Sequence, residues 1–346
     1  MLDLTPLGTW RPATDARTIE TIDAHTGGEP FRVVVSGIGP IEGDTILAKR
    51  RFARESLDAL RKAIMWEPRG HADMYGCLVT EPVTPGADLG VLFLHNEGYS
   101  SMCGHGIIAL VTVLHETRCL PGDLDHVVRI DAPAGLITAT AHRSGGRLDR
   151  VSFENVPSFV QSRGRVVDVP GLGPVRYDLA FGGAFYAYVD ARGLDLRLEP
   201  GSFRRIIDAG MAIKRAVAAA EPPIHPFEDD LSFLYGTIFT EPRPAPGIDS
   251  RHVCVFADGE VDRSPTGTGV SARVALLHGS GDMPSDRPVR IDSIVGSVFE
   301  GEAVLETTFG PHTAVIPRVS GRGWICGRNT WVLDPADPFV HGFFLR

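Results

Sequence analysis

The sequence predicts an α/β protein built from two similar lobes, each with a shell of β-strands around a central helix. Three observations lead to this prediction. The chain repeats itself once in a fixed order, each copy mixes strand-like and helix-like segments, and each copy contains one helix that is apolar on all sides. The 346 residues are enough for two domains with substantial cores.

The internal repeat rests on several matches at a nearly constant offset. YGCLVTEP (75–82) recurs as YGTIFTEP (235–242). SMCGHGIIALVTVLH (101–115) recurs as SPTGTGVSARVALLH (264–278), with seven of the fifteen positions identical. The string VRID also occurs once in each copy. Short Gly- and Val-rich strings can coincide, but matches in one order at one offset are hard to obtain by chance, so the repeat predicts two related lobes.

The repeat also predicts where the lobes begin and end. The N-terminal lobe is expected over residues 1–172 and the C-terminal lobe over residues 173–327, with the boundary in the Pro- and Gly-rich stretch 168–178. Residues 328–346 lie outside the repeat, and their return to the first lobe is part of the prediction.

The first part of each copy predicts strands followed by a helix. Runs of β-branched and aromatic residues at 31–35 and 185–189 come after a Gly-Gly pair and predict strands. Apolar residues share one helical face around 57–64, and the segment 203–219 has the same spacing. The two Tyr-Gly strings then predict one further strand in each copy.

A second strand, a Gly-rich turn and an apolar helix complete each copy. The strands are expected near 91–95 and 252–256, and the helices near 104–116 and 267–278. The apolar residues of these helices do not keep to one face, and a helix that is apolar all round is buried. Each lobe is therefore expected to be a mostly β shell around its own central helix.

Composition and charge exclude several classes of partner. The hydrophobic content of 43% and charged content of 22% are typical of a soluble globular protein. The net charge of -9 argues against nucleic acid or an anionic membrane as partner. The opening string MLDLTPLGTW lacks the basic and apolar regions of a signal peptide, and no apolar run approaches the length of a membrane span. The expected location is therefore the cytoplasm.

The five cysteines predict neither a disulfide framework nor a zinc site, because their number is odd and no two form a CxxC pair. The histidines show no metal-ligand spacing either, so no metal site is expected. Cys77, Cys119, Cys254 and Cys326 lie in ordinary contexts and are expected to be packing residues. Cys103 differs, because a turn would present its side chain at the start of a helix.

Both turn-to-helix motifs read Gly-x-Gly, at Gly104–Gly106 and Gly267–Gly269. Glycine lets a backbone approach a ligand closely, and the first turn of a helix offers free N–H groups and a positive dipole end to an anion. Both motifs also fit a loose dinucleotide-binding pattern. That pattern needs a strand running directly into the glycines, and the polar string HNEGYSS intervenes in the first copy.

The residue before each Gly-x-Gly is Cys103 in one copy and Thr266 in the other. The helix dipole is expected to favour the Cys103 thiolate, which can act as a base, whereas a threonine has no accessible ionisation. His105 could hydrogen-bond to a ligand or to the thiolate. Asp262 could hold a substrate ammonium or merely cap the turn, and the sequence leaves both interpretations open.

These motifs resemble the proline racemase family. The matching strings are DAHTGGEP (23–30), EPRGHADMYG (67–76), SMCGHG (101–106), ADGEVDRSPTGTG (257–269) and the tail from Gly323 through Pro335. The resemblance covers nearly the whole chain in the family's order. It implies a diaminopimelate epimerase-like fold of two pseudo-symmetric lobes, an active site between them and, in most members, a homodimer.

The resemblance also implies roles for residues. Racemases of the family have cysteine at both equivalent positions. Cys103 matches the first and Thr266 departs from the second, as in the family's trans-3-hydroxy-L-proline dehydratases. The substrate contacts of the family carry over to Gly104, His105, Asp262, Gly267 and Thr268.

The implied reaction is a dehydration of an imino acid without cofactor. Cys103 would remove the α-proton, the β-hydroxyl would leave, and the product would be Δ1-pyrroline-2-carboxylate. No metal, pyridoxal phosphate or nicotinamide is expected. Three alternatives stay open: a proline or 4-hydroxyproline racemase or epimerase with a substitute acid, a non-catalytic imino-acid binding protein, and a thiol enzyme that uses Cys103 as a covalent nucleophile. Thr266 argues against the first alternative, and the intact Cys103 against the second.

Overall fold

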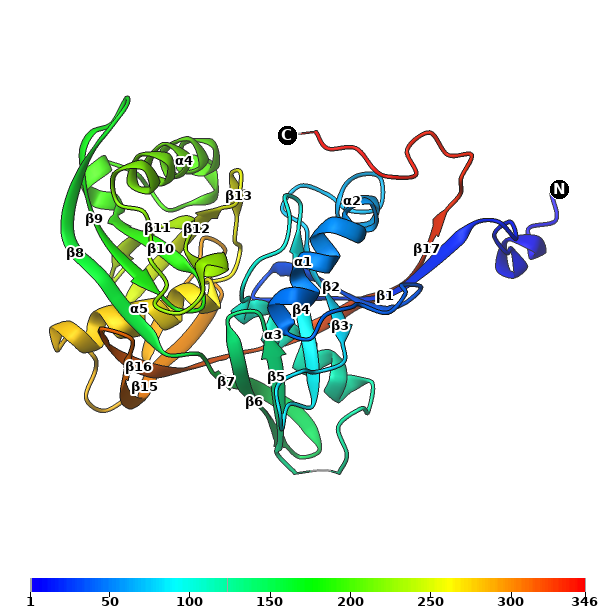
Figure 1. Cartoon of the computed structure of the whole chain (residues 1–346), viewed down its shortest axis with the longest axis horizontal. Helices are drawn as coiled ribbons and strands as arrows, with labels where there is room; N and C mark the ends of the chain where they lie inside the picture. The colour runs from blue at the N-terminus through cyan, green and yellow to red at the C-terminus, as the bar shows by residue number, and fades with distance from the viewer. Residues whose placement is uncertain (1, 123, 346) are drawn as a thin grey trace.

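The computed structural model of the chain, which describes residues 2–122 and 124–345, has two lobes lying side by side (Figure 1). The first lobe contains β1 (Arg17–Thr26), β2 (Glu29–Ser36), α1 (Ile46–Ser56), α2 (Asp58–Met65), β3 (Tyr75–Thr80), β4 (Leu89–His95), α3 (Gly104–Glu116), β5 (His126–Ala132), β6 (Gly135–Ser144) and β7 (Arg147–Glu154). A short 3-10 helix, Thr5–Thr9, precedes it and lies away from the lobe.

The second lobe contains β8 (Ser158–Val169), β9 (Gly173–Phe181), β10 (Phe185–Asp190), α4 (Phe203–Ala220), β11 (Leu234–Pro242), β12 (Ser250–Phe256), β13 (Glu260–Val261), α5 (Gly267–Ser280), β14 (Val289–Asp292), β15 (Val298–Phe309) and β16 (His312–Gly321). From β9 onward the second lobe repeats the order of the first, with one helix in place of α1 and α2 and with one additional short strand, β13. Short 3-10 helices connect some of them. The last strand, β17 (Gly323–Leu333), runs back to the first lobe and pairs with β1.

The predicted helix around residues 57–64 is α2, and a further helix that was not predicted, α1, comes directly before it. α1 ends at Ser56, and α2 begins at Asp58 after Leu57 leaves the helical conformation. The side chain of Asp58 accepts a hydrogen bond from Arg61 and pairs with Lys62, which favours a new helix start at this position. The apolar spacing showed only the second helix, because α1 carries the charged run Lys49-Arg50-Arg51.

The last strand of each repeat pairs with the first strand of the other repeat. β8 closes the first copy but pairs with β9, and β17 closes the second copy but pairs with β1. The predicted boundary near residue 172 therefore differs from the lobe boundary in space, because residues 170–172 form the turn of the β8–β9 hairpin. The chain passes from one lobe to the other between β7 and β8.

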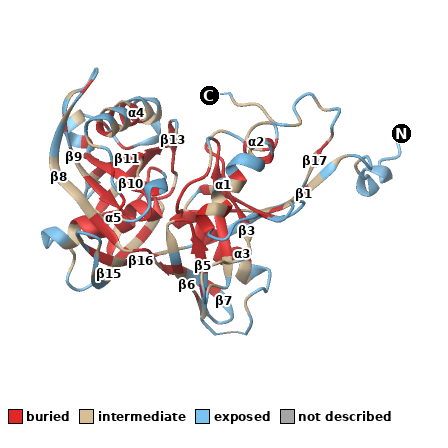
Figure 2. Ribbon diagram, in the orientation of Figure 1, coloured by how far each residue is buried: buried red, intermediate tan, exposed pale blue. Residues whose placement is uncertain are grey.

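The central helices are buried as predicted. Every residue from Gly104 to Val113 in α3 is buried, and so is nearly every residue from Gly267 to Leu276 in α5 (Figure 2). α3 contacts β1, β6, β7 and β17, and α5 contacts the matching set β8, β9, β15 and β16. The apolar surface of both helices is thus covered by strands, which explains why neither helix needs a polar face.

The outer helices cover the remaining sheet faces. α1 and α2 pack on β4, and α4 packs on β11 and β12. α4 is amphipathic: Ile206, Ile213 and Val217 are fully buried while residues on its other side are exposed. Among the residues that the structure describes, no helix is both long enough and apolar enough to span a membrane.

Candidate active site

The two central helices begin against each other at the junction of the lobes. A Cβ atom added to Gly104 would lie 2.5 Å from the Cα atom of Gly267, so the close approach requires glycine at this point. The two N-termini open onto one small cavity of about 10 Å³. The residues that line it come from both lobes: Tyr75, Met102, Cys103, Gly104, His105, Tyr186, Tyr235, Phe256, Asp262, Thr266, Gly267 and Thr268.

All seven residues that the sequence singled out line this cavity. They are Cys103, Gly104, His105, Asp262, Thr266, Gly267 and Thr268. The repeat explains why they meet, because equivalent turns of two pseudo-symmetric lobes face each other across the junction. Their meeting in one cavity gives the site its chemistry: one thiol, one imidazole, one carboxylate and two helix N-termini.

Cys103 occupies the N-cap position of α3. Its Sγ atom accepts a hydrogen bond from the Gly106 N–H at 3.2 Å, as an anion at a helix N-terminus would. The thiol is only 4% exposed, however, and burial raises its pKa well above the usual range. The carboxylates of Asp262 and Glu29 raise this pKa further. The hydrogen bond from the helix N-terminus lowers this pKa, in the direction that the sequence predicted, but the loss of hydration outweighs it.

His105 lies between the thiol and the carboxylate. Both of its ring nitrogens are 3.4 Å from Cys103 Sγ, and Nδ1 is 3.6 Å from Asp262 Oδ2. Its backbone carbonyl accepts a hydrogen bond from the Thr26 hydroxyl at 2.9 Å, which ties the first turn of α3 to β1. The imidazole is thus in contact with the thiol and faces the Asp262 carboxylate across a gap just beyond hydrogen-bond distance.

Asp262 performs the capping role that the sequence left open. Its Oδ1 atom accepts the Ser264 N–H at 2.7 Å and shapes the turn before α5. Its Oδ2 atom faces His105 inside the cavity, where it is available to a cationic ligand. One carboxylate therefore supports the turn with one oxygen and presents the other to the site.

Thr266 has an unusual backbone at the equivalent N-cap of α5. Its φ is 66°, a left-handed value that β-branched residues rarely adopt, and its N–H donates to Ser264 Oγ at 3.1 Å. Such strain persists where the surrounding structure holds it, and it is commonest at functional sites. Thr268, in the following turn, shares a hydrogen bond of 2.7 Å with the Tyr186 hydroxyl.

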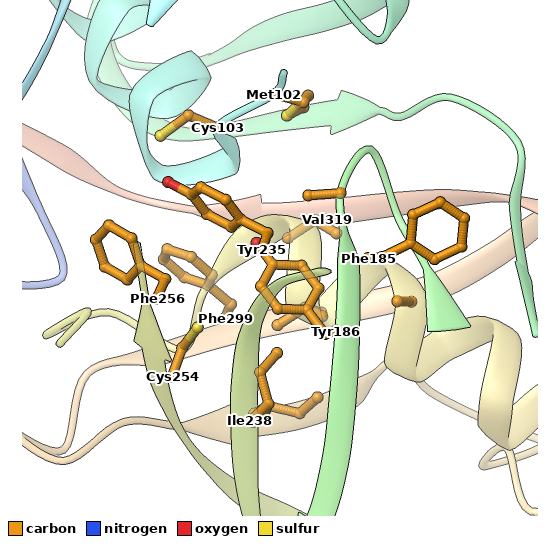
Figure 3. Close-up of a cluster of buried hydrophobic side chains, with 14 of the residues drawn as sticks. Met102, Cys103, Phe185, Tyr186, Tyr235, Ile238, Cys254, Phe256, Phe299 and Val319 are labelled. Atoms are coloured by element: carbon orange, nitrogen blue, oxygen red, sulfur yellow. The ribbon is translucent and has the colours of Figure 1, made fainter. Parts of the chain in front are cut away.

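Two further tyrosines line the site besides Tyr186, and none of the three was predicted as a site residue. The hydroxyls of Tyr75 and Tyr235 are 3.0 Å apart, and Tyr75 also hydrogen-bonds to Ser100. Figure 3 shows Tyr235 between Cys103 and the aromatic side chains of the second lobe. Burial raises the pKa of both phenols well above the usual value, so they remain protonated donors. They begin the two repeated Tyr-Gly strings, and this symmetry was the available signal.

A buried carboxyl, that of Glu29, holds the backbone next to Asp262. Glu29 Oε2 accepts the Arg263 N–H at 2.7 Å, while Oε1 has no hydrogen-bond partner among the described residues. Burial, followed by the charge of Asp262, raises the pKa of Glu29 well above its usual value. This carboxyl is therefore disposed to carry a proton close to the cavity.

Comparison with known proteins agrees with the sequence resemblance. The family model for proline racemase matches residues 21–344. A trans-3-hydroxy-L-proline dehydratase from Burkholderia ambifaria is 46% identical over 96% of this chain and 99% of the relative. A 3-hydroxyproline 2-epimerase from Burkholderia multivorans is also 46% identical, with the same coverage of both chains.

A solved structure has the same fold, although its sequence identity is lower than that of the relatives named above. The hydroxyproline epimerase from Agrobacterium vitis, with bound trans-4-hydroxy-L-proline, matches with a TM-score of 0.88 and 32% identity over 95% of this chain and 96% of that chain. The architecture is the diaminopimelate epimerase-like fold that the resemblance implied. Two repeated lobes, a site at their junction and a match along nearly the whole length lead to one conclusion: the chain belongs to the proline racemase family.

Proposed function

We propose that this chain dehydrates trans-3-hydroxy-L-proline to Δ1-pyrroline-2-carboxylate. The observation that carries the proposal is the unequal pair at the two helix N-termini, with a thiol at Cys103 and a hydroxyl at Thr266 in one cavity. Racemisation needs a base on one face of the substrate and an acid on the other, and a threonine hydroxyl serves neither role well. The names of the relatives support a hydroxyproline substrate, but they include both a dehydratase and an epimerase at equal identity.

The substrate would bind by its two opposite charges. Its carboxylate would rest on the free N–H groups of the Gly104 and Gly267 turns, where both helix dipoles favour an anion. Its ring ammonium would face Asp262, whose Oδ2 atom lies in the cavity. This arrangement orients Cα toward Cys103 and stabilises the negative charge that develops on the carboxylate as the α-proton leaves.

One base, Cys103, can carry out both proton transfers of the reaction. The Cys103 thiolate takes the α-proton, and the electron pair of the broken C–H bond forms a double bond between Cα and Cβ. The C–O bond at Cβ breaks, and the leaving hydroxyl takes a proton from the Cys103 thiol, or from a water next to it, and departs as water. In the trans-3-hydroxy-L isomer the α-proton and the hydroxyl share one face, so a single group can serve both steps. The enamine then tautomerises to the pyrroline.

The raised pKa of Cys103 is compatible with this role. In the free site Asp262 disfavours a second negative charge on the thiol. A bound ammonium would neutralise that carboxylate and so lower the pKa of Cys103 when substrate is present. The free cavity of about 10 Å³ is also far smaller than a proline, so the lobes would separate to admit substrate and close on it.

We further propose that the protein works without a cofactor, in the cytoplasm and as a homodimer. The thiol, the imidazole and the two helix ends supply the base and the charge stabilisation that the reaction needs. The family resemblance supports the dimer, and the charge and composition support the location. Sedimentation velocity of the purified protein tests the proposed dimer. We expect a single species with twice the mass of the chain.

Replacement of the base tests the proposed function. Cys103→Ser should lower the dehydration rate by about 100-fold or more, because a serine hydroxyl is a far weaker base. Cys119→Ser is the matched control, since Cys119 is an exposed free cysteine outside the cavity, and it should keep the wild-type rate. Rates near the wild-type value in Cys103→Ser would show that the mechanism is wrong.

A further inference from the structure

A second cavity lies in the C-terminal lobe, away from the active site. It encloses about 550 Å³, within the size range of small-molecule sites, and it shares no lining residue with the active-site cavity. Its walls come from β9, β10, β11, the start of β12, the short helix Ala191–Leu194 and α5. We call it the side cavity. Its lining includes Asp178, Tyr188, Thr240, Ser250 and Arg273.

Arg273 is the unusual group in this lining. Its Nε atom is buried and has no hydrogen-bond partner, and within residues 2–122 and 124–345 the guanidinium forms no ion pair. The Arg273 side chain as a whole is half-buried, but a desolvated Nε–H without an acceptor is costly, because its lost hydration is not compensated. An anion in the side cavity would remove this cost, and a carboxylate can accept two parallel N–H bonds from the guanidinium.

The internal repeat shows that the fold shared by the two lobes does not require an arginine at this position. Arg273 follows Ala272 in α5, and the equivalent residue after Ala109 in α3 is Leu110, which is buried in the apolar core. Tyr188 likewise stands where the first copy has the buried Val34, because the two strands pair with the repeated Tyr-Gly strands in the same register. The second lobe has thus exchanged two apolar core positions for polar side chains that line a cavity.

Opposite charge is present in the same cavity. Asp178 interacts electrostatically with Arg273 but forms no direct ion pair with it in the described part of the chain. One oxygen of Asp178 accepts the Gly164 N–H at 2.7 Å. At the rim, Asp190 and Arg192 neutralise each other at 2.6 Å. Arg176 adds an exposed positive charge at the rim. Inside the rim, the side cavity holds the separated charges of Arg273 and Asp178, with apolar wall from Val175 and Leu194.

We propose that the side cavity is a second ligand site, which binds a zwitterionic amino or imino acid. The carboxylate of the ligand pairs with Arg273, its ammonium lies toward Asp178, and its carbon skeleton rests on the apolar wall. A simple anion satisfies only the arginine, and a simple cation satisfies only the aspartate. The proposal is independent of the reaction assigned to the active site.

Calorimetric titration of the full-length protein with L-proline tests this site. L-Proline carries both charges and has no 3-hydroxyl to lose. Wild type should bind two molecules per chain, and Arg273→Leu should bind one, with at least a tenfold loss of affinity at the second site. Because both proteins have the same active site, their difference isolates the side cavity. Leucine is the residue of the equivalent position in α3, and Arg273→Gln provides a second, polar replacement.

Matched variants and probes decide the outcome. Arg176→Leu removes an exposed positive charge from the rim of the same cavity and should keep the second site. Acetate and pyrrolidine, which each carry one half of the zwitterion, should bind there at least tenfold more weakly than L-proline. Identical titrations of wild type, Arg273→Leu and Arg273→Gln would overturn the proposal. So would an equal loss in Arg176→Leu, or acetate binding as tightly as L-proline.

Discussion

At the scale of single residues, two equivalent N-cap positions carry side chains of very different acidity. Thr266→Cys would restore a thiol on the second face of the site, and we expect this variant to gain exchange and inversion at Cα of L-proline. Chiral chromatography and proton NMR in D2O would detect both. Thr268→Cys is the control, because it places a thiol two residues further along the same motif. Inversion in Thr268→Cys but not in Thr266→Cys would contradict the assignment of the second face.

The ionisation of Cys103 gives a pH prediction. The base must be deprotonated to act, so kcat/KM should rise with pH along one limb of its profile. Because burial raises the pKa of this thiol, the midpoint of that rise should lie above the usual thiol pKa of about 8.5. Asp262→Asn removes one charge that raises this pKa. Its limb should therefore shift to lower pH, while KM increases because the substrate ammonium loses its partner.

The pH profile of kcat/KM for wild type and Asp262→Asn measures this shift. Asp149→Asn, an exposed carboxylate on β7, is the control and should leave the limb in place. A limb that stays fixed or moves to higher pH in Asp262→Asn would show that Asp262 does not act on the thiol.

The positions of the candidate site residues could be predicted from the sequence, but their pKa values and contacts could not. The Gly-x-Gly repeat was sufficient to find Cys103 and Thr266, because equivalent turns of two lobes meet at the junction. It could not give the raised pKa of Cys103, since that depends on how completely strands and aromatic rings from both lobes exclude water. Tyr75 and Tyr235 were visible only as a repeated pair, and their contact depends on how the lobes pack.

At the scale of elements, the contact between the starts of α3 and α5 leaves no room for a side chain. In Gly104→Ala the new methyl group would lie 2.5 Å from Gly267 Cα and 2.9 Å from the Phe153 ring. We expect the two helix ends to move apart, with kcat/KM lower by about 100-fold, because a displacement near 1 Å is enough for such a loss.

Steady-state kinetics and thermal unfolding of Gly104→Ala would test this. Gly98→Ala is the matched control, because a Cβ atom at Gly98 meets nothing within 4 Å, and it should behave like wild type. Normal kinetics in Gly104→Ala would mean that the close approach of the helices is not needed for catalysis.

Short sequence patterns predicted most helices and strands. Each feature that they missed has an identifiable reason. The starts of α3 and α5 at Gly104 and Gly267 are as expected, because a Gly-rich turn leads into a long apolar run. α1 was missed because its charged run hides the apolar face. The positive φ of Thr266 has no signal in the sequence, since nothing in the amino-acid type requires it.

At the scale of the whole molecule, the exchanged strands β8 and β17 tie the two lobes together. One continuous apolar core contains residues of both lobes, such as Phe93 and Val255. Phe93→Ala should therefore destabilise the entire chain by about 3–5 kcal/mol in one cooperative transition. Differential scanning calorimetry should show a single peak at lower temperature. The exposed Leu124→Ala is the control, and two separate peaks for Phe93→Ala would contradict the coupling.

The exchange of strands also explains what the repeat could not predict. A repeat in sequence identifies equivalent segments but not their partners in a sheet. The sequence of β8 contains no signal that predicts pairing with β9 rather than with the strands of its own copy. The pairing becomes clear only when the hairpin at residues 170–172 and the return of β17 to β1 are seen together.

The central claim is that a single base on one face of the substrate carries out dehydration. Proton NMR of the purified protein with trans-3-hydroxy-L-proline in D2O tests it most directly, with L-proline and trans-4-hydroxy-L-proline in parallel. We predict that the 3-hydroxy substrate alone is converted to Δ1-pyrroline-2-carboxylate and that neither control is inverted. Deuterium at Cα of either control with inverted configuration would contradict the claim, because a group other than Thr266 would then deliver a proton to the second face.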